Sequence, residues 1–209
     1  MDPQFYRPIA ILCPLSKLLE KEFMTQMDKH MNKNKLWSNN IYSYRKAHNT
    51  TSALIDLMEV WMDNVNNNLQ NITMFLDLSA GFDCVKHDTL SQKLELYSFS
   101  EDCRKLINSY LKERKQCVAV SGKKSELRDV TTGVPQGTVL GPLLFLVFIN
   151  DMPNVVSSNI RLFADDALVY RSIHTHEDVV ALQADLRPFV KSQFLSNSDR
   201  ILQASKICL

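Results

Sequence analysis

Apolar residues recur every three or four positions in two stretches of the N-terminal third of the chain. The first runs from Leu15 to Met31, and this spacing predicts an amphipathic helix. The second runs from Leu54 to Val65 and follows a polar segment, 49–51, that is suited to cap a helix. We therefore expect two amphipathic helices, the second of them ended by the asparagine-rich stretch 64–71.

The hydrophobic period changes to two in the stretch "ITMFLDL", residues 72–78. This alternation predicts a strand with one apolar face, and Asp77 ends it. In "RLFADDALVY", residues 161–170, two short runs that read as buried strand flank Asp165 and Asp166. Burying isolated carboxylates is costly, so this pair requires either solvent at the tip of a hairpin or a partner such as a divalent metal ion. Both interpretations stay open on these residues alone.

Two further helices are expected in the middle of the chain. The stretches 87–99 and 100–111 both have helical spacing, and Asp88 and Ser100 are placed to cap their starts. Strands and helices then mix without regular alternation along the whole sequence. This mixture favours an α+β domain over a doubly wound sheet, and we find no clear domain boundary.

The second half of the chain adds a hairpin and two helices. Residues 115–130 predict a hairpin that turns near Gly122, and residues 139–150 are apolar on every side, which predicts a helix in the interior. A last helix begins near Thr175, and we expect Pro188 to kink or end it.

Composition limits the classes of protein that fit. The chain has 209 residues, 45% of them hydrophobic, which is enough for a real core in one domain. Its five cysteines are scattered and never spaced as CxxC, which argues against a disulfide framework or a zinc site and for a reducing compartment. The N-terminus lacks the pattern of a secretory signal, and the apolar run 139–149 is about half the length that spans a bilayer.

The net charge of +1 does not by itself indicate a nucleic-acid partner. Two local clusters of basic residues read as solvated faces: Lys112, Arg114 and Lys115, and then Lys123, Lys124 and Arg128.

Glycine is concentrated in one segment. Three of the five glycines, Gly133, Gly137 and Gly141, fall in "TTGVPQGTVLGPLL", directly before the expected interior helix. Glycine supplies backbone angles that other residues avoid and lets a ligand approach the main chain. The segment therefore fits a shaped loop against a nucleotide, or equally a tight turn forced by Pro135 and Pro142.

Three carboxylates converge if the two predicted strand regions are neighbours. Asp77, Asp165 and Asp166 would then repel one another unless cations offset their charge. Two divalent ions would do so, and they would clamp the attacking and leaving oxygens of an in-line phosphoryl displacement.

Six segments of the chain resemble, in order, the fingers and palm of a reverse transcriptase from a non-LTR (LINE-like, jockey-related) retrotransposon. They are "YRPIAILCPLSKLLEK", "YRKAHNTTSAL", "FLDLSAGFDCVKHDTL", "TTGVPQGTVLGPLLFLVFINDMP", "LFADDALVY" and, faintly, "LQASKI". The resemblance implies a right-hand polymerase fold with a small antiparallel sheet packed on helices. It also implies a partial domain over 1–209, fingers-like over about 1–70 and mostly palm over 71–209, with the thumb absent.

The same resemblance implies an RNA-directed DNA polymerase that uses an RNA template, a DNA primer and dNTPs. Asp77 and Asp165 would bind two Mg2+ ions, for which Mn2+ could substitute, with Asp166 beside them and the Leu78 carbonyl as a further metal ligand. Such an enzyme acts inside the cell, in the nucleus, the cytoplasm or both, without a membrane.

The family implies further roles for eight residues. Phe82 would be the aromatic gate that rejects a ribose 2'-hydroxyl. The others resemble positions that contact the nucleotide or template: Pro135, Gln136 and Gly137 along the incoming nucleotide, Arg7 at the triphosphate, Lys206 near the pyrophosphate, and Arg45 and Lys46 at the template backbone.

Some positions depart from the family pattern. Relatives usually read something like "LDLSKAFDTVDH" where this chain has Ala80, Gly81 and Lys86, and Ile41, Ser43 and Ala47 replace a glutamine and two glycines. Such changes are typical of a decayed copy, so a catalytically inactive remnant that only folds or binds a partner is the alternative. A non-polymerase metal phosphotransferase that uses the same three carboxylates is a second alternative.

Overall fold

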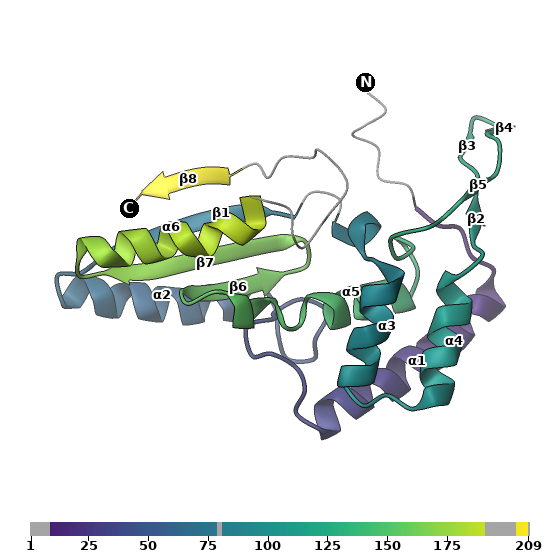
Figure 1. The fold of residues 1–209 in the computed structure, drawn as a ribbon, viewed down its shortest axis with the longest axis horizontal. Helices are drawn as coiled ribbons and strands as arrows, with labels where there is room; N and C mark the ends of the chain where they lie inside the picture. Colours follow the sequence, from purple (N-terminus) through teal and green to yellow (C-terminus); the bar gives the residue numbers. More distant parts are fainter. Residues whose placement is uncertain (1–8, 79–80, 191–203, 209) are drawn as a thin grey trace. The chain divides into compact units, whose positions relative to one another are not determined.

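The computed structural model describes residues 9–78, 81–190 and 204–208 (Figure 1). The chain divides into two compact units, the first made of residues 1–36 and 82–148 and the second of residues 37–81 and 149–209. The division of the chain into fingers-like and palm parts stays a prediction. Within the described residues, no helix is long and apolar enough to cross a membrane.

The second unit is built on a four-stranded sheet with the order β6–β7–β1–β8. Its strands are β1 (Gln70–Asp77), β6 (Asn159–Phe163), β7 (Asp166–Ile173) and β8 (Ala204–Cys208), and all neighbours are antiparallel. Helix α2 (Thr50–Asn66) contacts β1, helix α6 (His176–Val190) contacts β7, and the short 3-10 helix η3 (Met152–Val155) contacts β6. The predicted small antiparallel sheet with helices packed on it is confirmed.

Hydrophobic alternation explains the two central strands. In β1, Leu76 is buried while Phe75 and Asp77 are exposed, and the next residue, Leu78, is buried again. In β7, Ala167 and Val169 are buried, and Ala167 lies opposite Leu76. This face favours the observed register, because a shift by one residue would turn Leu76 to the other face. Thr73 and Tyr170, which pair on that other face, are buried as well.

The first unit is mainly helical. It contains α1 (Pro14–Lys33), α3 (His87–Leu96), α4 (Glu101–Leu111) and α5 (Leu140–Ile149), whose last residue belongs to the second unit. The short 3-10 helix η2 (Gly81–Cys84) crosses the border at residue 82. Two short ribbons complete the unit: β2 (Lys115–Gln116) pairs with β5 (Arg128–Asp129), and β3 (Ala119–Val120) pairs with β4 (Lys123–Lys124).

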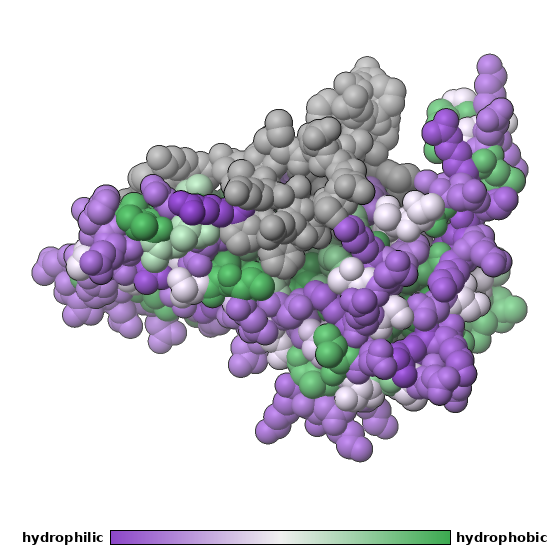
Figure 2. All heavy atoms as spheres, viewed as in Figure 1, coloured by the Kyte–Doolittle hydropathy of each residue, from purple (hydrophilic) through white to green (hydrophobic). Residues whose placement is uncertain are grey.

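The core of the first unit is apolar side chains from four helices. The six residues from Leu143 to Phe148 in α5 are all buried, which confirms the predicted interior helix. The other three helices contribute further buried side chains: Met27 and Met31 from α1, Leu90 and Leu94 from α3, and Ile107 and Leu111 from α4. On the face drawn in Figure 2, the surface over these helices is largely hydrophilic, with separate apolar patches.

The caps at the helix starts are mostly as expected. Asn49 caps α2 and forms a reciprocal capping box with Ser52, and the hydroxyl of Ser100 accepts a hydrogen bond of 3.3 Å from the Cys103 N–H. The predicted cap at Asp88 is wrong, because α3 begins one residue earlier and Lys86 occupies the cap position. The expectation that Pro188 kinks or ends the last helix is wrong as to the end, because α6 continues past it to Val190, and the kink stays a prediction.

Candidate active site

The three acidic residues come together at one end of the second unit's sheet. Asp77 is the last residue of β1, and Asp166, the first residue of β7, is its direct partner across the ladder. The Leu78 N–H donates a 2.7 Å hydrogen bond to the carbonyl oxygen of Asp165. Directly opposed residues of antiparallel strands have Cα atoms about 5 Å apart and side chains on the same face. The predicted convergence of the two strand ends is therefore confirmed.

The three aspartates differ in their exposure to solvent, and the alternation of buried and exposed side chains along the strands explains the difference. Asp77 and Asp166 are exposed, and Asp165 is half-buried. Their neighbours Leu78 and Ala167 are buried, which turns the acidic residues away from the apolar face. The two interpretations of the acidic pair are thus compatible: Asp165 lies in the hairpin turn, and Asp166 opens the strand that faces Asp77.

The hairpin turn is held by a segment from earlier in the chain. Ala164 has a positive φ of 54°, and its N–H donates a 2.8 Å hydrogen bond to the hydroxyl of Ser43, which is buried. Two residues before Ala164, Leu162 exchanges backbone hydrogen bonds of 2.8 and 2.9 Å with Asn40 and Tyr42. Ser43, one of the expected departures from the family pattern, therefore supports the turn that carries Asp165, a role that its sequence context does not reveal.

The donor atoms at this end of the sheet fit a hard divalent ion. Carboxylate and carbonyl oxygens are the ligands that Mg2+ prefers, and the sequence places three carboxylates and the Leu78 carbonyl there. The Leu78 carbonyl already accepts a 2.7 Å hydrogen bond from the Gly81 N–H, which occupies one of its two lone pairs. Among the described residues, no three Asp, Glu, His or Cys side chains are gathered closely enough to hold an ion as they stand. The metal site stays a prediction.

In the first unit, the glycine-rich segment is fastened to residues 82–85. The Gly133 N–H donates to the Val85 carbonyl and the Val134 N–H donates to the Phe82 carbonyl, both at 2.8 Å. Gly133 has a φ of +90°, and a Cβ atom there would lie 2.9 Å from the Cα of Asp83. Position 133 therefore requires glycine both for its backbone angle and for this close approach.

The same loop continues through the residues predicted to meet the nucleotide. The Gln136 amide donates to the Asp83 carboxylate at 3.1 Å, and the Gln136 carbonyl accepts from the Ala10 N–H at 2.8 Å. Gly137 has a φ of +81°, and a Cβ atom on Gly141 would lie 2.4 Å from the Pro135 carbonyl oxygen. The segment is thus a tightly shaped loop, while nucleotide contacts by Pro135, Gln136 and Gly137 stay predictions.

The proposed sugar gate, Phe82, packs in the first unit. Its ring stacks on Phe145 of α5, with centroids 4.4 Å apart and planes 16° from parallel, and the side chain is half-buried. This stacking fits an ordinary core phenylalanine as well as a rigid gate, so its role stays a prediction.

Sequence reasoning missed Glu20, the only buried acidic residue of the first unit within the described part of the chain. One of its carboxylate oxygens accepts from the N–H groups of Val139 and Leu140, at 2.8 and 3.2 Å. The other accepts from the Tyr110 hydroxyl at 2.9 Å. Glu20 therefore joins α1 and α4 to the start of α5. The available signal was its position on the helical stripe that buries Met27 and Met31.

The contacts of Glu20 also affect Tyr110. Burial, together with the adjacent Glu20 carboxylate, raises the pKa of Tyr110 to about 12, against the lowering effect of a hydrogen bond with Thr138. The tyrosine is therefore a neutral hydrogen-bond donor to Glu20 throughout the physiological range.

The remaining predicted residues are placed as follows. The Arg45 guanidinium donates to the carbonyls of Ser38 and Ile41, at 2.7 and 3.3 Å, and Lys46 is exposed. Lys206 lies on β8 opposite Met74, and Arg7 lies outside the described residues. Template and phosphate contacts by these four residues stay predictions.

Taken with the family comparison, the acidic strand ends and the glycine loop define the class of the protein. The sequence profile of the family described as "Reverse transcriptase (RNA-dependent DNA polymerase)" matches residues 2–208, and the chain belongs to this family. This membership sets aside the non-polymerase phosphotransferase.

Proteins similar to this chain include RNA-directed DNA polymerases of mobile elements. The chain is 31% identical over 191 residues to a probable polymerase from transposon BS of Drosophila melanogaster, covering 87% of this chain and 21% of that protein. It is 32% identical over 152 residues to the polymerase from mobile element jockey of the same species, covering 73% of this chain and 16% of that protein. The domain is therefore related to those of non-LTR retrotransposons, and the chain spans about a fifth of these relatives.

Among solved structures, the fold is similar to that of telomerase from Candida tropicalis. One such structure, determined in complex with a fragment of telomeric RNA, aligns with a TM-score of 0.66 over 93% of this chain and 34% of that chain, at 10% identity. A second, of the apo enzyme truncated from its C-terminal domain, gives a TM-score of 0.54 over 92% of this chain and 40% of that chain, at 9% identity. This likeness confirms the predicted α+β fold class.

Proposed function

We propose that this chain carries the polymerase site of a non-LTR retrotransposon and catalyses template-directed DNA synthesis on RNA. The observation that supports the proposal most is the ladder pairing of Asp77 with Asp166, together with the hydrogen bond from Leu78 to Asp165. The backbone thus brings the three aspartates to the ends of adjacent strands, and their side chains would close on the ions when these bind.

In this proposal the three aspartates and the Leu78 carbonyl hold two Mg2+ ions, or Mn2+ in their place. When bound, such ions offset the charge that develops on the attacking 3'-oxygen and on the leaving pyrophosphate. The protein's own contribution is positioning, since the antiparallel ladder fixes Asp77 and Asp166 on the same face while the Ser43 hydrogen bond holds the intervening turn.

Nucleotide and template selection would fall to other parts of the chain. Phe82 would exclude a ribose 2'-hydroxyl, and the loop containing Pro135, Gln136 and Gly137 would lie against the incoming dNTP. The flat stacking of Phe82 on Phe145 is compatible with this role, which rests on the position of Phe82 in the family motif. Arg7 and Lys206 would meet the triphosphate, while Arg45 and Lys46 would meet the RNA template.

The proposal is tested by extension of a DNA primer on an RNA template, with dNTPs and Mg2+. The variants are Asp165→Asn and the matched control Asp63→Asn, which removes an exposed carboxylate from α2 of the same unit. Extension by the unchanged chain and by the control, but not by Asp165→Asn, is the expected result. Equal extension by all three proteins would overturn the metal assignment.

The alternative is a copy that folds but no longer polymerises, and the departures from the family pattern support it. One of them, Ala47, adopts a φ of +62°, a conformation that side chains disfavour and that seven other non-glycine residues among those described share. A chain that unfolds cooperatively and binds the primer and template, yet extends nothing, would establish this alternative.

A further inference from the structure

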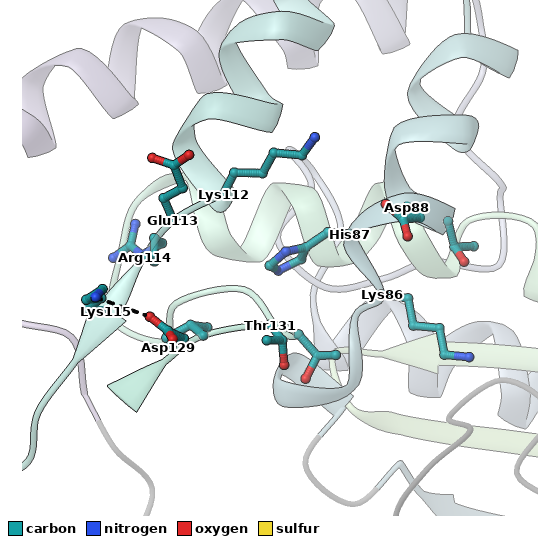
Figure 3. Close-up of a pocket in the computed structure, with 12 residues that line it drawn as sticks. Lys86, His87, Asp88, Lys112, Glu113, Arg114, Lys115, Asp129 and Thr131 are labelled. Carbon is teal, nitrogen blue, oxygen red and sulfur yellow. Dashed lines mark ion pairs between the residues drawn. The ribbon is translucent and has the colours of Figure 1, made fainter. Parts of the chain in front are cut away.

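The first unit contains a polar pocket that none of the proposed polymerase roles uses. It has a volume of about 950 Å³ and is lined by residues 86–89, 112–115 and 129–132 (Figure 3). Four cationic side chains line it, Lys86, Lys112, Arg114 and Lys115, against three acidic ones, Asp88, Glu113 and Asp129. Figure 3 shows Lys86 at one end of the pocket and the Lys115–Asp129 ion pair at the other.

Backbone contacts hold the walls of this pocket in place. The Val130 N–H donates a 2.8 Å hydrogen bond to the Arg114 carbonyl, beside the pairing of β2 with β5. The His87 imidazole hydrogen-bonds the Gly133 carbonyl at 2.8 Å, which ties the start of α3 to the loop after β5. The walls of the pocket are therefore joined by one backbone hydrogen bond and one bond from the His87 side chain.

Two cations of the pocket are available to a ligand. The Arg114 guanidinium lies over the Tyr110 ring at 5.0 Å, and Lys112 is exposed. Neither makes an ion pair with a carboxylate within the part of the chain that the structure describes. Lys115 does pair with Asp129, but at 3.7 Å and with both side chains more than half exposed, so water and salt weaken that attraction.

A β-ribbon extends the basic surface from the rim of the pocket. Lys115 and Asp129 belong to β2 and β5, and beyond them β3 and β4 form a projecting ribbon that turns at Gly122 (Figure 1). Every residue of these four short strands is exposed. The ribbon adds three cationic side chains, Lys123, Lys124 and Arg128, to those of the pocket.

Positive charge is concentrated in this segment. Residues 112–129 contain six basic and three acidic residues, a net charge of +3, whereas the whole chain has a net charge of +1. Between the cations, the side chains of Val118, Val120 and Leu127 are 56%, 65% and 67% exposed. Figure 2 shows the resulting mixture of hydrophilic and hydrophobic residues on the ribbon. A two-stranded ribbon with this mixture suits a nucleic-acid strand, whose phosphates bind cations and whose sugars and bases contact apolar groups.

We propose that one basic surface binds the phosphodiester backbone of a nucleic-acid strand. This surface, called the basic ribbon from here on, consists of Lys112, Arg114, Lys115, Lys123, Lys124 and Arg128, together with Lys86 in the pocket. It is a contact surface additional to the polymerase site and independent of catalysis. Arg114 and Lys112 engage phosphates at the pocket, and the lysines of β4 engage the strand as it continues along the ribbon. Because phosphates carry no sequence information, the binding depends on charge and salt and only weakly on sequence.

The test is fluorescence anisotropy with a labelled 20-nucleotide RNA of mixed sequence, and with a DNA of the same sequence. Binding is measured between 50 and 200 mM salt, in EDTA and without dNTPs, so that no polymerisation occurs. The ribbon variant is Lys123→Gln/Lys124→Gln/Arg128→Gln, and the pocket variant is Lys112→Gln/Arg114→Gln. The matched control, Lys21→Gln/Lys29→Gln/Lys33→Gln, removes three exposed charges from α1 of the same unit.

The unchanged chain should bind RNA with an affinity that falls steeply as salt rises. Removal of one phosphate-binding cation lowers the slope of log K against log salt by about 0.7 for a single strand, so the ribbon variant should lower it by about 2. We expect the ribbon variant to bind at least tenfold more weakly at 100 mM salt, the pocket variant several-fold more weakly, and the control within twofold of the unchanged chain. Thermal unfolding at an unchanged temperature excludes misfolding as the cause.

Three results would overturn the proposal. The first is that the unchanged chain binds no RNA at 50 mM salt. The second is that the ribbon variant and the control lose RNA affinity equally. The third is that polyglutamate displaces the labelled RNA at the same charge concentration as unlabelled RNA does. The last would assign the ribbon to an acidic protein. Comparison of RNA with DNA shows which backbone is preferred. Asp165→Asn should retain the binding, so a failed polymerase proposal and a failed ribbon proposal give different results.

Discussion

Replacing Glu20 should destabilise the first unit more than any other single loss of a carboxylate in that unit's described residues. The side chain is 4% exposed and accepts hydrogen bonds from the N–H groups of Val139 and Leu140 and from the Tyr110 hydroxyl. The two N–H groups belong to the start of α5, where helix donors have no partner within the helix. Glu20 thus acts as a cap supplied by a distant helix.

The magnitude follows from the three donors. Each buried donor left without a partner costs about 1–3 kcal/mol, and entry of water after truncation recovers part of this, so Glu20→Ala should cost about 3 kcal/mol. Glu20→Gln keeps one carbonyl oxygen but turns an amide toward the other donors, so it should cost about half as much. For a chain of this size, 3 kcal/mol lowers the melting temperature by about 6–12 °C.

The assay is urea and thermal unfolding followed by circular dichroism, with Glu22→Ala as the control. Glu22 lies on the same helix, is exposed, and accepts a 2.8 Å hydrogen bond from the Gln26 amide, so its loss should cost less than about 0.5 kcal/mol. Tyr110→Phe should cost about 1 kcal/mol, and its effect should shrink in the Glu20→Ala background because the two groups share a hydrogen bond. Equal stability of Glu20→Ala and Glu22→Ala would refute the reasoning.

Three further predictions concern other features. Ala47→Gly should stabilise the second unit by about 0.5–1 kcal/mol, because position 47 has a φ of +62°. The control Ala53→Gly, within α2, should destabilise the unit by a similar amount. Urea unfolding of both variants measures the two effects. Gly133→Ala should cost about 2 kcal/mol in the same assay, because the added methyl would lie 2.9 Å from the Cα of Asp83 at a φ of +90°. Hydrogen bonds from two backbone N–H groups and an arginine lower the pKa of Asp178 to about 2, below its ordinary 3.8. The ionised Asp178 carboxylate therefore stabilises the fold above about pH 4, and this stabilisation is lost as the pH falls toward 2. In Asp178→Asn, the free energy of unfolding should depend less on pH between about 4 and 2.

Much of the fold could be predicted because local pattern and tertiary structure agree. The alternation in 72–78 identified β1 and its last residue, Asp77, and the apolar run 139–150 identified α5. The convergence of Asp77 with Asp166 needed one assumption, that the two strands are neighbours, and the ladder confirms it. Glycine clustering likewise identified a loop in which Gly133 and Gly137 have positive φ angles.

What could not be predicted depends on contacts between distant segments. Glu20 resembles any charged residue of an amphipathic helix until α5 is placed beside it. Ser43 reads as a departure from the family until Ala164 is seen to donate to it. The stripe of α2 predicted the helix correctly, but not its burial: Met58 is 48% and Met62 is 60% exposed. Periodicity determines which residues share a face and leaves open what covers that face.

The central claim is that Asp77, Asp165 and Asp166 form a metal-dependent polymerase site. The most direct measurement is incorporation of a single dNTP into a primer annealed to RNA, at increasing Mg2+, for the unchanged chain, Asp165→Asn and Asp63→Asn. We predict Mg2+-dependent incorporation that Asp63→Asn retains and that falls by at least about 100-fold in Asp165→Asn, the scale expected for loss of one group that stabilises transition-state charge. Incorporation by Asp165→Asn at the rate of the unchanged chain would contradict the account.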